Sequence, residues 1–223
     1  MSKKLFAESF AKFIGGFTLT ALMIFIPAGS LHFANGWIFL SALFVPMFFA
    51  GLFMMRGNPE LLKKRLYVKE KQKGQKAIVA ISGAMFVIGF IISGLDFRFG
   101  WSSLPRSISL GALTVFLISY LLYARVLSEN PYLSRTVEIQ KDHKVIDTGL
   151  YSVVRHPMYS VTVAMFLMMP LILGSVYSFF VFLIYPFIIS ARIIEEEKFL
   201  EKELKGYQKY KKEVKYRLIP FIW

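Results

Sequence analysis

Long hydrophobic segments alternate with short polar ones along most of the sequence. Each of the first four hydrophobic segments approaches the roughly 20 residues that cross a bilayer as a helix. We therefore predict four membrane-spanning helices, at residues 13–33, 36–55, 77–95 and 107–127. Only Ala34 and Asn35 separate the first two of them, so these two helices should form a tight hairpin.

The last hydrophobic segment, residues 160–191, is too long for one straight crossing. A single helix of these 32 residues would measure about 48 Å, whereas the hydrocarbon core of a bilayer is about 30 Å thick. Gly174 and Ser175 lie near the middle of the segment, and Pro170 and Pro186 flank them. This pattern favours two short helices that form a hairpin, and the alternative is one tilted and kinked helix.

The distribution of charge predicts how these segments are oriented. Lys and Arg are concentrated in the N-terminal arm, in residues 56–76 and 128–159, and in the tail, which should be helical to about Val214. By the positive-inside rule, both termini and residues 128–159 should face the cytoplasm. We thus predict an all-α fold, a polytopic membrane helix bundle of five to six spans that includes a C-terminal short helical hairpin, plus a cytoplasmic C-terminal helix. Residues 1–127 should form a four-span membrane region, and residues 128–223 a second region that carries the polar chemistry.

Composition supports a membrane protein and excludes several other classes. Hydrophobic residues make up 56% of the chain, compared with about 45–50% in soluble domains. The formal net charge is +13, and the basic residues lie between the apolar segments. This placement indicates membrane topology and contact with membrane lipids rather than binding of nucleic acid. The absence of cysteine excludes disulfides, iron–sulfur clusters, cysteine-ligated zinc and a thiol nucleophile. The three histidines lack the spacing of metal ligands, so we expect no metal site at His32, His143 or His156.

A polar cluster immediately precedes the last hydrophobic segment. Pro157 suits the first position of a helix, whose free backbone N–H groups attract anions, and Arg155 adds a full positive charge beside them. Gly149 would allow a tight turn, and Tyr151 and Tyr159 supply rings and hydroxyl groups. A plainer interpretation is that the arginine and the tyrosines are interfacial residues and that the histidine caps the helix. The candidate residues of this cluster are Gly149, Tyr151, Arg155, His156, Pro157 and Tyr159.

A second charged cluster follows the last hydrophobic segment. Arg192 and Glu196 are four positions apart and share one helix face, where they could simply form an ion pair. If the chain returns from the membrane as a hairpin, this cluster reaches the level of the first one. A pocket between two clusters of opposite sign could hold a zwitterion, with its carboxylate toward Arg155 and its cation toward Glu196 or Glu197.

The two clusters together resemble the signature of the isoprenylcysteine carboxyl methyltransferase family, which is related to the membrane phospholipid methyltransferases. The first half is Gly149-x-Tyr151-x-x-x-Arg155-His156-Pro157-x-Tyr159. The second half is Arg192-Ile193-x-x-Glu196-Glu197-x-x-Leu200, Leu204-x-Gly206-Tyr207-x-x-Tyr210 and Val214-x-Tyr216-Arg217-Leu218-Ile219-Pro220. Both halves occur in the expected order and separation. The resemblance covers about residues 145–223, whereas residues 1–127 resemble the family only in being a set of spans.

The resemblance implies an integral membrane enzyme that transfers a methyl group from S-adenosyl-L-methionine to a lipophilic acceptor. The acceptor enters from the bilayer, and its reacting group is a carboxylate, an amine or a thiol. We expect catalytic roles for Arg155, His156, Tyr159, Arg192 and Glu196. We expect cofactor contacts from Gly149, Tyr151, Arg155, His156, Pro157, Tyr159, Glu196 and Glu197.

Two other functions stay open. Membrane reductases of the sterol type have a similar C-terminal architecture and bind NADPH, although they would need further basic residues for its 2′-phosphate. A non-enzymatic membrane lipid-binding protein would have no affinity for either cofactor. Titration with NADPH and with S-adenosylhomocysteine separates the three.

Overall fold

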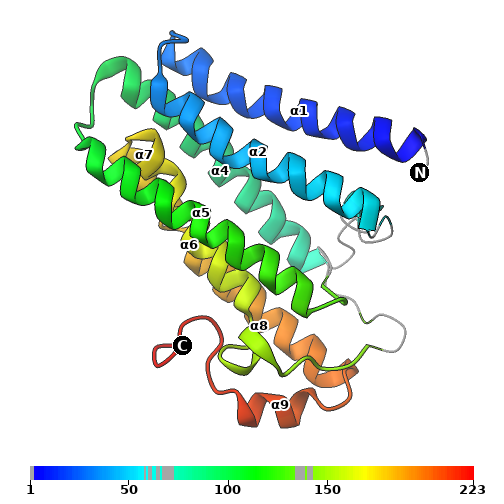
Figure 1. Ribbon diagram of the computed structural model, residues 1–223. Coiled ribbons are helices and arrows are strands. Elements are labelled where there is room, and N and C mark those ends of the chain that lie inside the picture. Colours follow the sequence, from blue (N-terminus) through cyan, green and yellow to red (C-terminus); the bar gives the residue numbers. More distant parts are fainter. Residues whose placement is uncertain are drawn as a thin grey trace.

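The computed structural model of the protein describes residues 3–57, 59, 62–63, 66, 73–133, 139 and 143–223, so most of the basic segment 56–76 lies outside the described residues. Within the described ranges, all regular secondary structure is helical, as the sequence predicts. Four long helices come first: α1 (Lys3–Ala28), α2 (Ala34–Gly57), α4 (Lys73–Phe99) and α5 (Arg106–Glu129). Each is long and apolar enough to cross a membrane, and Figure 1 shows them as neighbouring, tilted rods. The protein is therefore a polytopic membrane helix bundle.

A helical hairpin follows, as the length of the last hydrophobic segment predicts. α6 (Pro157–Leu173) ends at Gly174, whose φ of 81° lies in the left-handed region that glycine adopts without strain. The chain then turns into α7 (Val176–Phe182) and α8 (Tyr185–Glu203), and α8 returns beside α6 (Figure 1). The alternative of one kinked helix is wrong, because the left-handed turn reverses the direction of the chain.

The charged tail departs from the prediction of one helix to about Val214. α8 ends at Glu203, Gly206 has a φ of 92°, and a separate short helix, α9 (Tyr207–Glu213), follows. The left-handed glycine breaks the helix and redirects the chain across the end of the bundle (Figure 1). This part of the tail has a small hydrophobic core of its own, formed by Leu204, Tyr207, Tyr210 and Val214 with Val145 against it.

Small residues set the distance of α4 from its neighbours. A Cβ atom added to Gly94 would collide with the backbone oxygen of Ile24 in α1, and one added to Gly89 would collide with the ring of Phe182 in α7. Close approach of this kind is how helices associate in membranes, where burial of apolar surface gives little driving force. The contacts join the hairpin to the first spans, and one continuous hydrophobic core includes residues from both.

A polar cluster holds the tip of the hairpin against the end of α4. Asp96 is 2% exposed and accepts hydrogen bonds from the backbone N–H and the hydroxyl of Ser102, both at 2.6 Å. It also accepts one from the hydroxyl of Ser175, in the hairpin turn. The Ser102 hydroxyl in turn accepts the N–H of Val176 at 2.9 Å. These bonds fasten the tip of the hairpin. Other contacts of α6 and α8 with the bundle position its base.

Candidate functional site

A cavity of about 110 Å³ lies at the base of the hairpin, between the start of α6, the last turns of α8 and α9. A short 3-10 helix, η1 (Gly149–Ser152), closes one side of it. The polar residues that line the cavity are Asn130, Tyr132, His143, Lys144, Tyr151, Arg155, His156, Tyr159, Arg192, Glu196, Tyr207 and Tyr210. Both clusters that the sequence singles out are therefore present in its walls.

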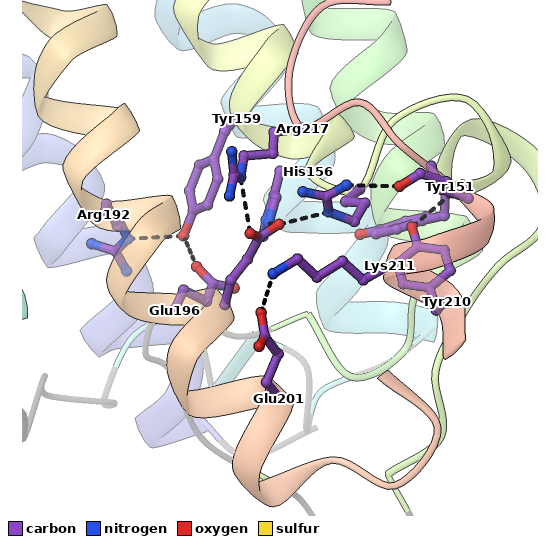
Figure 2. Close-up of polar contacts among 12 residues, drawn as sticks. Tyr151, His156, Tyr159, Arg192, Glu196, Glu201, Tyr210, Lys211 and Arg217 are labelled. Atoms are coloured by element: carbon purple, nitrogen blue, oxygen red, sulfur yellow. Dashed lines mark hydrogen bonds and ion pairs between the residues drawn. The ribbon is translucent and has the colours of Figure 1, made fainter. Parts of the chain in front are cut away.

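Glu197 lies at the centre of a buried charge cluster beside this cavity. Its exposure is 2%, and its carboxylate oxygens accept hydrogen bonds from Nε of Arg155 at 2.6 Å and from Nε of Arg217 at 2.9 Å. Nε2 of His156 lies 3.3 Å from the same oxygen that Arg155 contacts. These groups reach Glu197 from the start of α6 and from the C-terminal segment, and Figure 2 labels two of them, His156 and Arg217. Charge-assisted bonds to two guanidinium groups offset the cost of burying the carboxylate.

Arg155 also joins the start of α6 to the C-terminal segment. Its Nη1 donates to the backbone oxygens of Val214 and Lys215, at 2.7 and 2.8 Å. Its backbone N–H donates to the backbone oxygen of Tyr216 at 2.9 Å. The side chain is 3% exposed. The geometry differs here from the expectation that a ligand carboxylate pairs with Arg155, because Glu197 and two carbonyl groups already engage this guanidinium. In this arrangement Arg155 holds three segments together.

Tyr159 connects the two clusters directly across the cavity wall. Its hydroxyl donates to Oε2 of Glu196 at 2.6 Å and accepts from Nε of Arg192 at 2.8 Å (Figure 2). Arg192 and Glu196 present one face of α8, as their four-residue spacing predicts, and the ring of His156 stacks on that of Tyr159 with centroids 5.7 Å apart. The phenol thus orients a guanidinium and a carboxylate at the edge of one cavity.

Buried tyrosines form the opposite wall. The Tyr151 hydroxyl accepts a hydrogen bond from Nδ2 of Asn130 at 3.0 Å, and the Tyr210 hydroxyl donates to the backbone oxygen of Tyr151 at 2.7 Å. Burial raises the pKa of the Tyr151, Tyr207 and Tyr210 phenols, because the charged phenolate is disfavoured away from water. These hydroxyls therefore stay protonated and can act as hydrogen-bond donors.

Two buried polar atoms in the cavity walls have no hydrogen-bond partner among the residues that the structure describes. They are Nδ1 of His143 and the hydroxyl of Tyr207. The His143 ring stacks on Tyr132 with centroids 4.4 Å apart, and burial lowers the pKa of the imidazole, which keeps it neutral. Buried polar groups are nearly always paired, so a bound polar ligand is the natural partner for both atoms.

The structure divides the predicted site residues into two groups. Those that line the cavity are Tyr151, Arg155, His156, Tyr159, Arg192 and Glu196. The other three, Gly149, Pro157 and Glu197, are not among the lining residues. Gly149 has a φ of 60°, and a Cβ atom there would come within 2.5 Å of the Glu129 carboxylate, which accepts the N–H of Leu150. Pro157 is the first residue of α6, as predicted.

Several lining residues are absent from the predicted set. Tyr207, Tyr210 and the partner Arg217 belong to the second half of the family signature, which is the signal that could have identified them. Asn130 and His143 have no such signal, because only the folded chain brings these two side chains to the cavity. In the part of the chain that the structure describes, no group of three or more His, Asp or Glu side chains could hold a metal ion.

Comparison with protein families connects the middle of the chain with a known family. The model of the isoprenylcysteine carboxyl methyltransferase (ICMT) family matches residues 110–202, which run from α5 through the cavity-forming segments to the end of α8. The match confirms the resemblance that the sequence motifs indicate, and it associates these residues with membrane methyltransferases. No curated protein matches the chain.

Proposed function

We propose that the protein is an integral membrane methyltransferase that uses S-adenosyl-L-methionine and methylates a lipophilic acceptor. The observation that carries this proposal is that the hairpin brings both charged clusters into one cavity, where Tyr159 contacts Arg192 and Glu196. The match to the methyltransferase family includes these residues and supports the same reaction class.

The residues of the cavity suit the charges of the cofactor. S-adenosylmethionine has an ammonium and a carboxylate group, a cationic sulfonium, and the ring nitrogens and hydroxyl groups of adenosine; when bound, it supplies an electrophilic methyl group. We infer that Glu196 receives a cationic group, since the neighbouring Glu197 is already paired with two arginines. Nδ1 of His143 and the Tyr207 hydroxyl are the candidates for bonds to the polar groups of the cofactor.

The protein's own residues would then align the cofactor with the acceptor, exclude water from the cavity and remove a proton from the acceptor where one must be lost. Alignment of donor and acceptor is the largest contribution expected of them, and the largely buried walls favour a reaction in which charge is neutralised. A carboxylate acceptor needs no base, whereas an amine or a thiol must lose a proton, and the candidates to assist in this are His156, Glu196 and Tyr159. We propose Arg155, His156, Tyr159, Arg192 and Glu196 as the catalytic wall. We propose that Gly149, Tyr151, Pro157 and Glu197 shape the cofactor site with them.

The proposal extends to the organisation of the chain. Residues 128–223 would form the cofactor-binding region, and residues 1–127 the membrane region that supports it. The concentration of Lys and Arg in the N-terminal arm, in residues 56–76 and 128–159 and in the tail supports a cytoplasmic location for the cavity and both termini. A lipophilic acceptor would then reach the cavity from the bilayer.

Binding of S-adenosylhomocysteine to the purified protein in lipid nanodiscs tests the proposal by calorimetry. Replacing Glu196 with glutamine should weaken binding at least about tenfold, since a hydrogen bond between charged groups contributes about 1.5–3 kcal/mol. Glu195→Gln is the matched control, because Glu195 is exposed on the same helix and does not line the cavity. The absence of any affinity in the unaltered protein, or equal affinity in both variants, would refute the assignment. Binding of NADPH instead would favour a reductase.

A further inference from the structure

The C-terminal segment beyond α9 exposes three large apolar side chains outside the long helices. Ile219, Phe221 and Ile222 are 48%, 86% and 76% exposed. Phe221 has a φ of 68°, a left-handed conformation that a bulky residue adopts only under constraint. The loop thus turns large hydrophobic side chains outward, although it carries the residue Arg217 that pairs with buried Glu197.

This loop is a defined structure. The backbone oxygen of Trp223 accepts the N–H groups of Arg217, Leu218 and Ile219, at 2.8, 2.9 and 3.3 Å, and so closes the turn. The Arg217 guanidinium lies 4.9 Å from the centre of the Trp223 ring. Leu218 is buried and belongs to the main hydrophobic core. The exposed side chains are consequently held in place by the same turn that anchors the loop to the protein.

The hydrogen bonds of the loop place it beside the first turn of an apolar helix. The backbone oxygen of Tyr216 accepts the N–H of Arg155, and that of Leu218 accepts the hydroxyl of Ser160, in α6. Figure 1 shows the chain turning back from α9 toward the helices before it reaches the loop. α6 contains no charged residue from Pro157 to Leu173 and packs among candidate membrane spans. The loop therefore lies beside the end of an apolar helix that packs among candidate membrane spans.

We propose that residues 215–223 form an interfacial anchor, in which Ile219, Phe221 and Ile222 insert into the bilayer that the helices cross. The flanking residues are of the types that belong at the boundary between headgroups and hydrocarbon, namely Lys215, Tyr216 and Trp223. The occupant of the apolar surface is thus lipid of the same membrane. Because Arg217 belongs to this loop, the anchor also fixes the depth of the Glu197 cluster relative to the lipid surface.

Site-directed spin labelling tests this proposal without any cofactor, so its outcome is independent of the proposed function. The chain has no cysteine, and Phe221→Cys and Ile222→Cys variants can each carry one nitroxide in the full-length protein in nanodiscs. Phe187→Cys in α8 is the lipid-facing control, since Phe187 is 76% exposed within a candidate span. Lys209→Cys in α9 is the aqueous control, since its side chain is 82% exposed.

The measurement is the collision rate of each nitroxide with oxygen, which concentrates in lipid, and with a water-soluble nickel chelate. Labels at 221 and 222 should collide with oxygen more often than with the chelate and should resemble the label at 187. A chelate-dominated ratio like that at 209 would overturn the proposal, since it would place the loop in water. Low collision rates with both reagents would also overturn it, because they would show the loop buried against another protein surface.

Discussion

Asp96, at the tip of the helical hairpin, and Glu197, at its base, are both 2% exposed, yet the protein satisfies the two carboxylates in different ways. Asp96 accepts hydrogen bonds from neutral donors, the N–H and hydroxyl of Ser102 and the hydroxyl of Ser175. Glu197 accepts them from two guanidinium groups, those of Arg155 and Arg217, beside an imidazole.

The difference shows what each cluster does for the hairpin. The donors to Asp96 come from the connection after α4 and from the hairpin turn, and they fasten one end of a mainly apolar structure. The donors to Glu197 come from the start of α6 and from the C-terminal loop, and they close the wall of a polar cavity. The adjacent Glu196 accepts the hydroxyl of Tyr159 at the edge of this cavity. We call the cluster at the tip, Asp96 with Ser102 and Ser175, the clasp, because its role is structural. We call the cluster at the base, Glu197 with Arg155 and Arg217, the frame of the candidate site.

Removing Arg155 should break the frame and have the largest effect. Arg155→Met leaves the buried Glu197 with one arginine fewer and unpairs two carbonyl groups, so unfolding in mixed detergent micelles should require about 3–5 kcal/mol less. The double variant Arg155→Met with Glu197→Leu should recover part of this loss, because it also removes the buried carboxylate that has lost a partner. Equal losses in the single and double variants would show that charge pairing does not stabilise the frame.

Removing Asp96 should break the clasp at a smaller cost. Asp96→Ala leaves donors from Ser102 and Ser175 without their acceptor, which should lower the free energy of unfolding by about 1–3 kcal/mol in the same assay. Asp96→Asn, which keeps one acceptor oxygen, should lose less. Affinity for S-adenosylhomocysteine should survive in a folded Asp96→Ala protein, and its loss would contradict the division between clasp and frame.

A third variant tests whether the frame depends on the turn that leads into it. Gly149→Ala should cost about 1–2 kcal/mol of stability, because the residue has a φ of 60° and the new Cβ would press on the Glu129 carboxylate. Gly111→Ala in α5 is the matched control, since no atom lies within 4 Å of its added Cβ and alanine favours a helix. Equal stability of the two variants, measured by thermal unfolding, would remove the argument for the turn.

The smallest expected effect is on the pH dependence of stability, and it comes from His143, whose pKa is lowered by burial. His143 takes up a proton in the unfolded chain near its ordinary pKa of about 6.5 but only at lower pH in the folded protein. Stability should therefore fall as the pH drops from about 6.5 toward the lowered pKa. His143→Gln should flatten this part of the stability profile, measured by unfolding at a series of pH values. An unchanged profile would show that His143 has no part in it.

Much of the fold follows from simple features of the sequence. The lengths of the apolar segments predict the first four spans, and the excess length of the fifth, with Gly174 near its middle, predicts the hairpin. The tail was predicted less well, because the pattern of charges in it is compatible with one helix and the left-handed conformation of Gly206 is not visible in that pattern. The spacing of Arg192 and Glu196 predicts their shared face, which the structure confirms.

The sequence by itself determined that this chain crosses a membrane as helices, and that two charged clusters of unusual composition flank its last apolar segment. It could do so because segment length and residue spacing act locally along the chain. Only the tertiary structure decided which charges meet. It paired Arg155 with Glu197, directed Glu196 to the cavity through Tyr159, and brought His143 and Tyr207 to the same walls. Those choices depend on packing between segments far apart in sequence, where burial without a partner is costly and each polar group must find one.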